Sequence, residues 1–308
     1  MKPTLILFCA LIASAGTASA KPKYPPEMPD AREVVYKTAS ETKLKLWIFE
    51  PKDHQATDKR PAVVFFFGGG WRSGTPSQFE KQCQYLASRG MVAMTADYRV
   101  ATRQQTKATA CVEDGKSAVR WIRANAKKLG VDPNRIAAGG GSAGGHVAAS
   151  TGMVPGFEAK GEDHDISSVP DALLLFNPAV VLAKVPGKFE FPAEKAALFK
   201  ERMGVEPSEL SPYHQVRNGL PPTIIFHGTN DSAVPFRTVE LLEQRMKDEG
   251  NTCKLVGYEG QPHGFFNWRR ARNSPFRNTM FSCDRFLEKL GWLEGKPTIE
   301  AFIKGQAN

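Results

Sequence analysis

The stretch RIAAGGGSAGGHVAAS at residues 135–150 decides how this chain folds. Its apolar first part reads as a buried strand and its second part as the start of a helix, and the two meet at Gly140-Gly141-Ser142-Ala143-Gly144. So tight a turn needs glycines on both sides of the serine, because side chains there would crowd the strand against the helix. The pattern predicts that Ser142 stands exposed at the helix amino-terminus, where its hydroxyl is placed as a nucleophile.

Outward from this turn, short β-branched or aromatic runs alternate with longer segments of helical period from Pro61 onward. This alternation predicts a mostly parallel central sheet with helices on both faces, and two earlier runs predict an antiparallel pair at one edge. The edge pair lies at 34–38 and 44–51, the central strands at 61–70, 91–99, 135–140, 172–180, 223–228 and 253–260, and the helices at 76–90, 109–130, from 143 onward and at 276–293. In the last helix, the residues expected to face the sheet are Phe281, Phe286, Leu287 and Leu290.

The chain contains no linker long or polar enough to divide it, so residues 21–308 are expected to form one domain. Residues 1–20 begin with one positive charge, continue apolar and finish Ala-Ser-Ala, which is typical of a secretory signal peptide. Their apolar run is too short for a membrane span, so we expect an exported protein, periplasmic or extracellular. The stretch at about 181–218 interrupts the alternation and is either a small lid over the carboxyl ends of the strands or an ordinary surface excursion.

The composition argues against several classes of protein. Lysine and arginine number 41 against 32 aspartate and glutamate, and the net charge of +9 favours acidic partners without bearing on the fold. No zinc-type spacing of cysteine and histidine and no nucleic-acid-binding signature occurs. We therefore predict no metal, no cofactor and no nucleic-acid partner, and the oligomeric state stays open.

Four cysteines follow residue 20, and in an exported protein they allow up to two disulfides in three pairings. They are Cys83, Cys111, Cys253 and Cys283. Each also lies within an apolar pattern, so buried free thiols are an equal alternative. Among the bridges, Cys83–Cys111 is the first to consider, because it closes a short loop.

A serine hydroxyl needs a base to accept its proton and a carboxylate to hold that base in the right tautomer. His263 lies in EGQPHGFFN after the last predicted strand, and Asp231 lies in HGTNDSAVP after the strand before it. Both fall in loops at the carboxyl ends of parallel strands, the edge at which Ser142 also stands. We interpret Ser142 as the nucleophile, His263 as the base and Asp231 as the orienting acid.

Other histidines and carboxylates are weaker candidates. His146 lies one helical turn beyond the serine, but its side chain leaves the helix away from the exposed hydroxyl, which favours a packing or surface role. His227 precedes the Asp231 turn and is expected to support it by hydrogen bonding. Glu259 and Asp97 also stand at strand ends, but neither lies one strand before the base histidine.

A glycine loop, Phe67-Gly68-Gly69-Gly70-Trp71, ends the first central strand. Such a loop can aim backbone N–H groups at the oxygen that becomes negative during acyl transfer. We predict that the N–H groups of Gly69, Gly70 and Ala143 form this oxyanion hole. Trp71 is expected to line the pocket for the acyl or alcohol part of the substrate.

Taken together, the GGGW loop, DYR, DPNRIAAGGGSAGG, HGTNDSAVP and PHGFF, in this order over about 60–293, resemble the α/β-hydrolase esterases, specifically the branch of bacterial feruloyl and acetyl-xylan esterases. The chain order serine, acid, histidine is also that of the fold. The resemblance implies hydrolysis of small acyl esters, free or linked to polysaccharide, through an acyl-serine intermediate and without a cofactor. One departure is Phe67, where relatives commonly have a histidine that helps to order the glycine loop; the backbone donors survive, but the rigidity of the loop is in question.

Two hypotheses extend this interpretation. The segment HGFFNWRRARNSPFR places Arg269 and Arg270 close to the base, as a possible anion site for an acidic polymer such as a uronate-bearing polysaccharide, with a solvated loop as the alternative. The alternative activity is an amide hydrolase, either arylformamidase-like or a peptidase. A catalytically inactive hydrolase fold used for binding is disfavoured, because the nucleophile, base, acid and glycine loop are all present.

Overall fold

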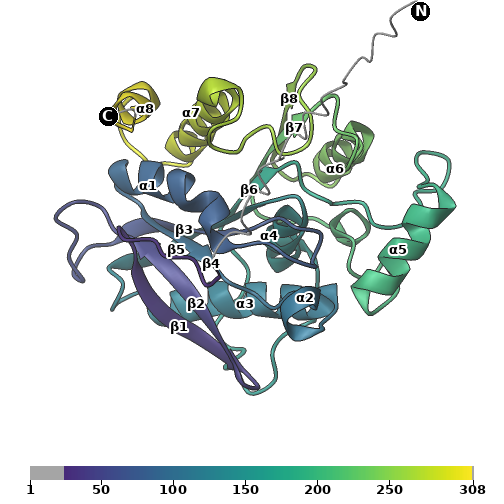
Figure 1. Cartoon of the computed structure of the whole chain (residues 1–308), viewed down its shortest axis with the longest axis horizontal. Helices are drawn as coiled ribbons and strands as arrows, with labels where there is room; N and C mark the ends of the chain where they lie inside the picture. Colours follow the sequence, from purple (N-terminus) through teal and green to yellow (C-terminus); the bar gives the residue numbers. More distant parts are fainter. Residues whose placement is uncertain (1–23, 307–308) are drawn as a thin grey trace, which may run out of the picture.

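The computed structural model describes residues 24–306, so the predicted signal peptide at 1–20 lies outside the described residues. The strands of its single sheet are β1 (Arg32–Ala39), β2 (Thr42–Phe49), β3 (Arg60–Phe66), β4 (Val92–Ala96), β5 (Val131–Gly141), β6 (Ala172–Phe176), β7 (Thr223–Gly228) and β8 (Cys253–Tyr258). They are ordered β1-β2-β4-β3-β5-β6-β7-β8 (Figure 1). β1 pairs antiparallel with β2, and β2 pairs antiparallel with β4. The remaining neighbours, β4-β3, β3-β5, β5-β6, β6-β7 and β7-β8, are all parallel. The predicted sheet with an antiparallel edge is therefore confirmed.

Helices cover both faces of this sheet. They are α1 (Glu80–Ser88), α2 (Ala101–Gln104), α3 (Ala108–Ala124), α4 (Ala143–Met153), α5 (Ala193–Met203), α6 (Phe236–Asp248), α7 (Ser274–Lys289) and α8 (Ile299–Gly305), with 3-10 turns η1 (Pro76–Phe79), η2 (Pro212–Gln215) and η3 (Ala271–Asn273). One hydrophobic cluster joins the sheet to α3, α4, α5 and α6, and a second joins its other face to α1, α7 and α8. Figure 1 shows α1, α7 and α8 on one side of the strands and α3 and α4 on the other.

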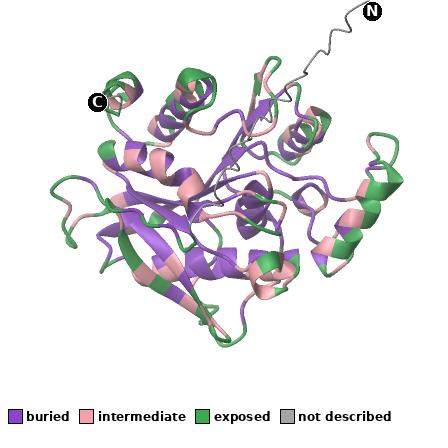
Figure 2. Cartoon of the chain, viewed as in Figure 1, coloured by how far each residue is buried: buried purple, intermediate pink, exposed green. Residues whose placement is uncertain are grey.

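The sequence of β3 explains why the sheet is buried on both sides. Val64 and Phe66 belong to the first cluster, whereas Val63 and Phe65 belong to the second, because successive side chains of a strand point to opposite faces. A strand covered by helices on both faces is therefore apolar at every position. Figure 2 shows the central strands buried and the outer surfaces of α5, α7 and α8 exposed.

Two details of the predicted helices need correction. Helix α6 was not predicted, although Val239, Leu242 and Met246 are buried at helical spacing. In α7, the prediction that Phe281 faces the sheet is wrong: its side chain is 49% exposed, whereas Leu287 is fully buried. The buried stripe runs one position earlier, through Met280, because each residue rotates about 100° around the helix axis.

The four cysteines are buried free thiols. Cys83 on α1 belongs to the second hydrophobic cluster and Cys111 on α3 to the first, so the sheet lies between them and the bridge considered from the sequence cannot form. Cys253 and Cys283 are likewise divided between the two clusters. Burial raises the pKa of all four thiols, which keeps them protonated and unreactive at neutral pH.

The interrupting segment at about 181–218 is packed onto the main core. Phe199 and Met203 of α5 and Tyr213 of η2 belong to the first cluster. Lys195 of α5 donates a hydrogen bond to the Ala233 carbonyl at 2.5 Å, in the loop after β7. The segment therefore lies at the carboxyl ends of the strands, and its action as a lid stays a prediction. None of the helices in the described part of the chain is long and apolar enough to cross a membrane.

Candidate active site

Ser142 occupies a strained turn between β5 and α4. Its φ of 55° and ψ of −119° fall in a region that residues with side chains rarely adopt. Its N–H donates to the Phe176 carbonyl at 2.9 Å, and its own carbonyl accepts the His146 N–H at 3.0 Å. A Cβ at Gly144 would lie 2.1 Å from the Phe66 carbonyl oxygen, so only glycine permits this close approach. The tight turn that the sequence predicts is therefore formed, with the hydroxyl raised above the helix.

The structure brings Ser142, His263 and Asp231 together at the carboxyl ends of β5, β8 and β7. Ser142 Oγ lies 3.0 Å from His263 Nε2, and His263 Nδ1 lies 2.7 Å from Asp231 Oδ2. Because an ionised carboxylate only accepts hydrogen bonds, Nδ1 carries the imidazole proton and Nε2 presents a lone pair to the serine hydroxyl. This is the tautomer that a general base for Ser142 requires.

Several donors hold Asp231 ionised. Its Oδ1 accepts the N–H groups of Ala233 and Val234 at 2.9 and 2.8 Å. Its Oδ2 lies 3.2 Å from Nε2 of His227, which therefore supports the acid as the sequence predicts. Burial alone would raise the pKa of Asp231, but the hydrogen bonds from His227, His263 and Val234 outweigh burial and hold that pKa below its ordinary value.

The glycine loop and the serine line the same cavity, of about 500 Å³. Gly69 and Gly70, with φ of 131° and 63°, line this cavity together with Ser142 and His263. Within residues 24–306 their N–H groups form no hydrogen bond, so both are available to an oxyanion. Ala143 is buried and is not among the residues that line the cavity, and its N–H has no acceptor within α4 because it is the first residue of that helix, so its part in the oxyanion hole stays a prediction.

Aromatic contacts hold this loop around Phe67, the position at which the resemblance to α/β-hydrolase esterases leads to the expectation of a histidine. The Phe67 carbonyl accepts a hydrogen bond from the Tyr98 hydroxyl at 2.5 Å. The Phe67 and Tyr98 rings stack with their centroids 4.1 Å apart. Arg103 lies over the Phe67 ring and donates to the Gly74 carbonyl at 2.8 Å. The rigidity of the loop, which the missing histidine puts in question, is supplied by this stack.

The prediction for Trp71 needs correction. Trp71 does not line the cavity that holds Ser142, and its side chain is buried beneath a neighbouring cavity. The indole N–H donates to His146 Nδ1 at 3.0 Å, while His146 Nε2 donates to the Leu210 carbonyl at 2.8 Å. His146 therefore has the packing role expected of it. The sequence could not reveal this orientation because it depends on the positive φ of Trp71, 60°.

Stability between pH 6.5 and 4 is expected to depend on His146. Burial lowers its pKa to about 4, so over this range the unfolded chain binds a proton that the folded protein does not, and stability falls as the pH falls. In urea unfolding, replacing His146 with glutamine should reduce the loss of unfolding free energy between pH 7.5 and 4.5 by about 2 kcal/mol. Replacing the exposed His164 with glutamine should leave the loss of unfolding free energy between these two pH values unchanged. Equal losses in the wild type and His146→Gln would contradict this account.

A chain of side-chain amides connects the glycine loop to the base loop. Gln78 Oε1 accepts the Gly68 N–H at 2.6 Å, and Gln78 Nε2 donates to Asn267 Oδ1 at 3.0 Å. Asn267 Nδ2 donates to the Gly264 carbonyl at 2.9 Å, and the Gly264 N–H donates to Asn177 Oδ1 at 2.9 Å. The backbone donors at both ends determine the orientation of every amide in the chain. All of these residues line the catalytic cavity.

Sequence reasoning missed these amides. Asn177 directly follows β6 at its carboxyl end, which is a usable signal, and Asn267 lies four residues after the base. Gln78 gives no signal, because its partner is distant in sequence. Asn177 Nδ2 is buried and has no hydrogen-bond partner in the described residues.

Replacing Gln78 with leucine is expected to lower kcat by about tenfold to a hundredfold with little change in KM. The change leaves the Gly68 N–H unpaired and frees the loop that carries the oxyanion donors, a loss smaller than that of a donor itself. Steady-state kinetics on a p-nitrophenyl ester measures it. Gln84→Leu, the same change in α1, which follows the turn that carries Gln78, is the control. A kcat of Gln78→Leu within twofold of the wild type would show that the amide chain does not position the loop.

The two arginines of the predicted anion site separate in the structure. Arg270 lines the catalytic cavity, whereas Arg269 does not. The Arg269 N–H donates to Asn273 Oδ1 at 2.5 Å, and both arginine side chains are exposed. The structure therefore leaves Arg270 alone beside the catalytic histidine.

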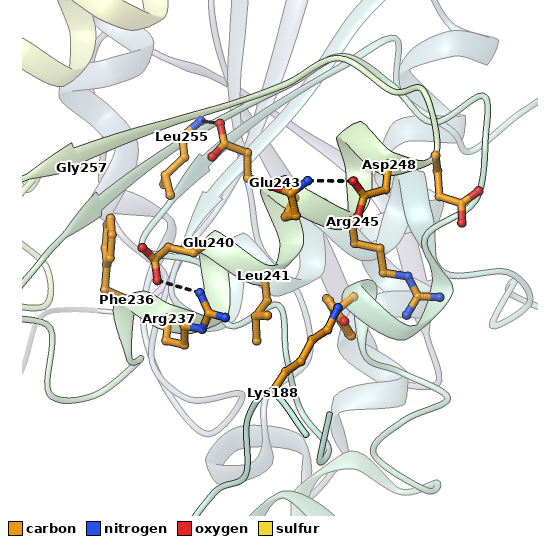
Figure 3. Close-up of a pocket in the computed structure, with 13 residues that line it drawn as sticks. Lys188, Phe236, Arg237, Glu240, Leu241, Glu243, Arg245, Asp248, Leu255 and Gly257 are labelled. Carbon is orange, nitrogen blue, oxygen red and sulfur yellow. Dashed lines mark hydrogen bonds and ion pairs between the residues drawn. The ribbon is translucent and has the colours of Figure 1, made fainter. Parts of the chain in front are cut away.

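A larger cavity, of about 860 Å³, lies along α6 (Figure 3). Figure 3 shows Arg237 directed at Glu240, and their charged atoms are 3.4 Å apart. Glu243 accepts the N–H of Leu255 at 2.9 Å and so occupies a backbone donor of the edge strand β8. This cavity contains no nucleophile with an adjacent base. In the described residues no group of three or more histidine, cysteine, aspartate or glutamate side chains is arranged to hold a metal ion.

An eight-stranded, mostly parallel sheet, with a serine on a strained strand-to-helix turn and an acid and a histidine on later loops, defines the α/β-hydrolase fold. Residues 46–246 match the family model described as BD-FAE, which is more than half of the 308-residue chain. The chain belongs to the BD-FAE family.

Two solved forms of one bacterial esterase are similar to this chain. Thermogutta terrifontis esterase 2 phosphonylated by sarin is 52% identical, with a TM-score of 0.87, and the match covers 89% of this chain and 100% of that chain. The propionate-bound form is also 52% identical, with a TM-score of 0.84, over 89% of this chain and 99% of that chain. The fold predicted from the sequence is confirmed by these likenesses.

Curated relatives are more distant. Esterase LipC of Mycobacterium tuberculosis is 29% identical over 266 residues, which cover 79% of this chain and 62% of that protein. The probable isoprenylcysteine alpha-carbonyl methylesterase ICMEL1 of Arabidopsis thaliana is 28% identical over 245 residues, which cover 75% of this chain and 50% of that protein. The chain thus spans between half and 62% of the length of these relatives. The resemblance to α/β-hydrolase esterases is confirmed, and the finer branch of feruloyl and acetyl-xylan esterases stays a prediction.

Proposed function

We propose that this protein is a serine carboxylesterase that removes small acyl groups, of acetyl or feruloyl type, from carbohydrate or related esters. The observation that carries the proposal is the alignment of Ser142 Oγ with His263 Nε2 at 3.0 Å, in a cavity that Gly69 and Gly70, whose N–H groups form no hydrogen bond in the described residues, also line. A nucleophile with its base, facing unoccupied backbone donors, is the arrangement that acyl transfer requires.

The reaction follows from these positions. His263 Nε2 takes the hydroxyl proton as Ser142 Oγ attacks the ester carbonyl carbon, and the carbonyl oxygen becomes negative beside the glycine loop. Asp231 stabilises the imidazolium. When the ester C–O bond breaks, His263 returns the proton to the departing alcohol and leaves an acyl group on Ser142. Water, deprotonated by the same histidine, then attacks the acyl-serine and releases the acid.

The wall of the cavity supports a small acyl group and a polar alcohol. It carries three amide side chains and several glycines, which make it polar and leave room beside Ser142. Phe266 is the aromatic ring on this wall. Thermogutta terrifontis esterase 2 has been solved with propionate bound and with butyrate bound, and this likeness favours short acyl chains here as well.

Export is part of the proposal. It rests on the signal-like sequence of residues 1–20, and it predicts a mature chain that begins at Lys21. Amino-terminal sequencing of the protein from the periplasm and the medium tests it. A mature protein that retains residues 1–20 in the cytoplasm would contradict export and leave the esterase proposal untouched.

Hydrolysis of p-nitrophenyl acetate, butyrate and octanoate and of methyl ferulate, with Ser142→Ala as the control, tests the activity. We expect turnover of the short esters that the variant lacks. The ratio of acetate to ferulate rates distinguishes small-acyl from aromatic-acyl selectivity. If no ester is hydrolysed but N-formylkynurenine or a peptide amide is, the amide-hydrolase alternative replaces this proposal. If none is hydrolysed, the fold serves binding.

A further inference from the structure

A second cavity, of about 340 Å³, adjoins the catalytic cavity. Gly70 lines both, so the glycine loop is the wall between them. The other walls come from α2, from the residues that precede α3, and from α5 in the interrupting segment. Three cationic residues line it: Arg72 beside the glycine loop, Lys107 before α3 and Arg202 on α5.

The two arginines lack partners. Within residues 24–306, neither the Arg72 nor the Arg202 side chain forms a hydrogen bond or an ion pair, whereas many other arginines of the chain are paired with carboxylates. A Cβ on Gly70 would lie 3.2 Å from Arg202 Nη1, so this guanidinium stands next to the loop that faces Ser142. Burial and the like charge of Arg72 both lower the pKa of Arg202.

Repulsion between adjacent cations is costly unless an anion joins them. Glu201 lines the same cavity, and its negative charge acts on the pKa of Arg202 in the opposite sense, but its carboxylate comes within ion-pair distance of no cation in the described part of the chain. Its carbonyl accepts a hydrogen bond from Lys107 at 2.8 Å, which directs that ammonium to the rim. Three positive charges against one negative charge leave the cavity cationic. The Thr106 hydroxyl on its wall is buried without a partner and is a further donor.

We infer that this cavity binds a carboxylate that the ester substrate carries, so that the enzyme prefers anionic esters over neutral ones of the same size. Guanidinium groups bind carboxylates through paired hydrogen bonds, and Gly70 places the site beside the scissile bond. The inference rests on the proposed esterase function. The carboxylate belongs either to the acyl chain, as in a dicarboxylic half-ester, or to the alcohol, as in a uronate or hydroxybenzoate.

Two matched pairs of substrates distinguish these sources. 4-Nitrophenyl hydrogen glutarate against 4-nitrophenyl valerate tests the acyl side, and 4-acetoxybenzoate against 4-acetoxybenzamide tests the alcohol side. In Arg72→Gln and in Arg202→Gln, the anionic-to-neutral ratio of kcat/KM should fall about tenfold for one pair, because a hydrogen bond to a charged group is lost. Arg202→Lys should retain part of the ratio. Ratios within twofold of the wild type for both pairs, in both variants, would overturn the inference.

Arg285→Gln is the control for net charge. Arg285 lies on α7 in a cavity with Ile224 and Lys254, at the amino ends of β7 and β8 and away from the active site. Its removal should leave both ratios unchanged. A fall equal to that of Arg202→Gln would attribute the effect to overall charge and would overturn the inference.

Binding to Ser142→Ala protein separates the inference from the proposed function. Calorimetric titration with 4-acetoxybenzoate and with monomethyl glutarate should give a Kd for one of them that rises about tenfold when Arg72→Gln is added. An arginine-dependent Kd in a protein that hydrolyses no ester would retain the anion site and reject the esterase. A Kd independent of the arginines, or no binding, in a protein that hydrolyses neutral esters would reject the anion site and retain the esterase.

Discussion

Replacing His263 with alanine is expected to lower kcat by about a millionfold, because the Ser142 hydroxyl then has no group to accept its proton. The residual rate should be that of the glycine loop and of substrate binding alone. KM should change little, since the imidazole stabilises the transition state and contributes little to binding of the intact ester. Steady-state kinetics on p-nitrophenyl acetate measures the loss of kcat. Ser142→Ala should lose as much kcat as His263→Ala.

The matched control is His164→Ala, which removes an exposed imidazole whose Nε2 lies 2.9 Å from the Ala159 carbonyl oxygen. Its kcat should stay within twofold of the wild type. His146→Ala should lower stability more than kcat, since that ring is fully buried between Trp71 and Leu210. A His263→Ala protein that keeps more than one hundredth of the wild-type kcat would show that another group accepts the proton.

Replacing Asp231 with asparagine is expected to lower kcat by about ten thousandfold. The asparagine oxygen would take the place of Oδ1, which accepts two backbone N–H groups, and its amide would then face His263 Nδ1. An amide donates where a carboxylate accepts, so the imidazole proton would move to Nε2 and the lone pair facing Ser142 would be lost.

The control for this variant is Glu259→Gln, a neutralised carboxylate that is exposed just after β8. It should keep the wild-type kcat, and circular dichroism should show that Asp231→Asn remains folded. A loss below tenfold in Asp231→Asn would mean that His227 or a solvent molecule orients the base in its place.

Much of the fold follows from short patterns because each has one dominant physical cause. β3 is apolar at every position from Pro61 to Phe66, which requires helices on both faces, and Gly144 leaves no room for a side chain at the turn. The positions of Asp231 and His263 were predictable because parallel strands end at a common edge.

The remainder depends on contacts between residues far apart in the chain. Cys83 and Cys111 are close in sequence, but their helices cover opposite faces of the sheet. Gln78 meets Asn267 across 189 positions, and no local pattern marks that pair. Trp71 follows the predicted glycine loop, yet a single positive φ turns its side chain away from the cavity that holds Ser142.

The separation of contacting residues along the sequence also limits what could be predicted about substrates. Arg269 and Arg270 lie near the base in sequence and so predict an anion site there, whereas Arg72 and Arg202 line one cavity beside Gly70 because α5 packs against the residue that follows the glycine loop.

The central claim is that Ser142 carries the acyl group, and adduct mapping tests it most directly. The mature protein would be treated with a fluorophosphonate, weighed intact by mass spectrometry and digested to locate the modified residue. We predict one adduct per chain, on Ser142, formed in step with the loss of esterase activity, and no adduct on Ser142→Ala. An adduct on another residue, or full ester hydrolysis by Ser142→Ala, would contradict the account.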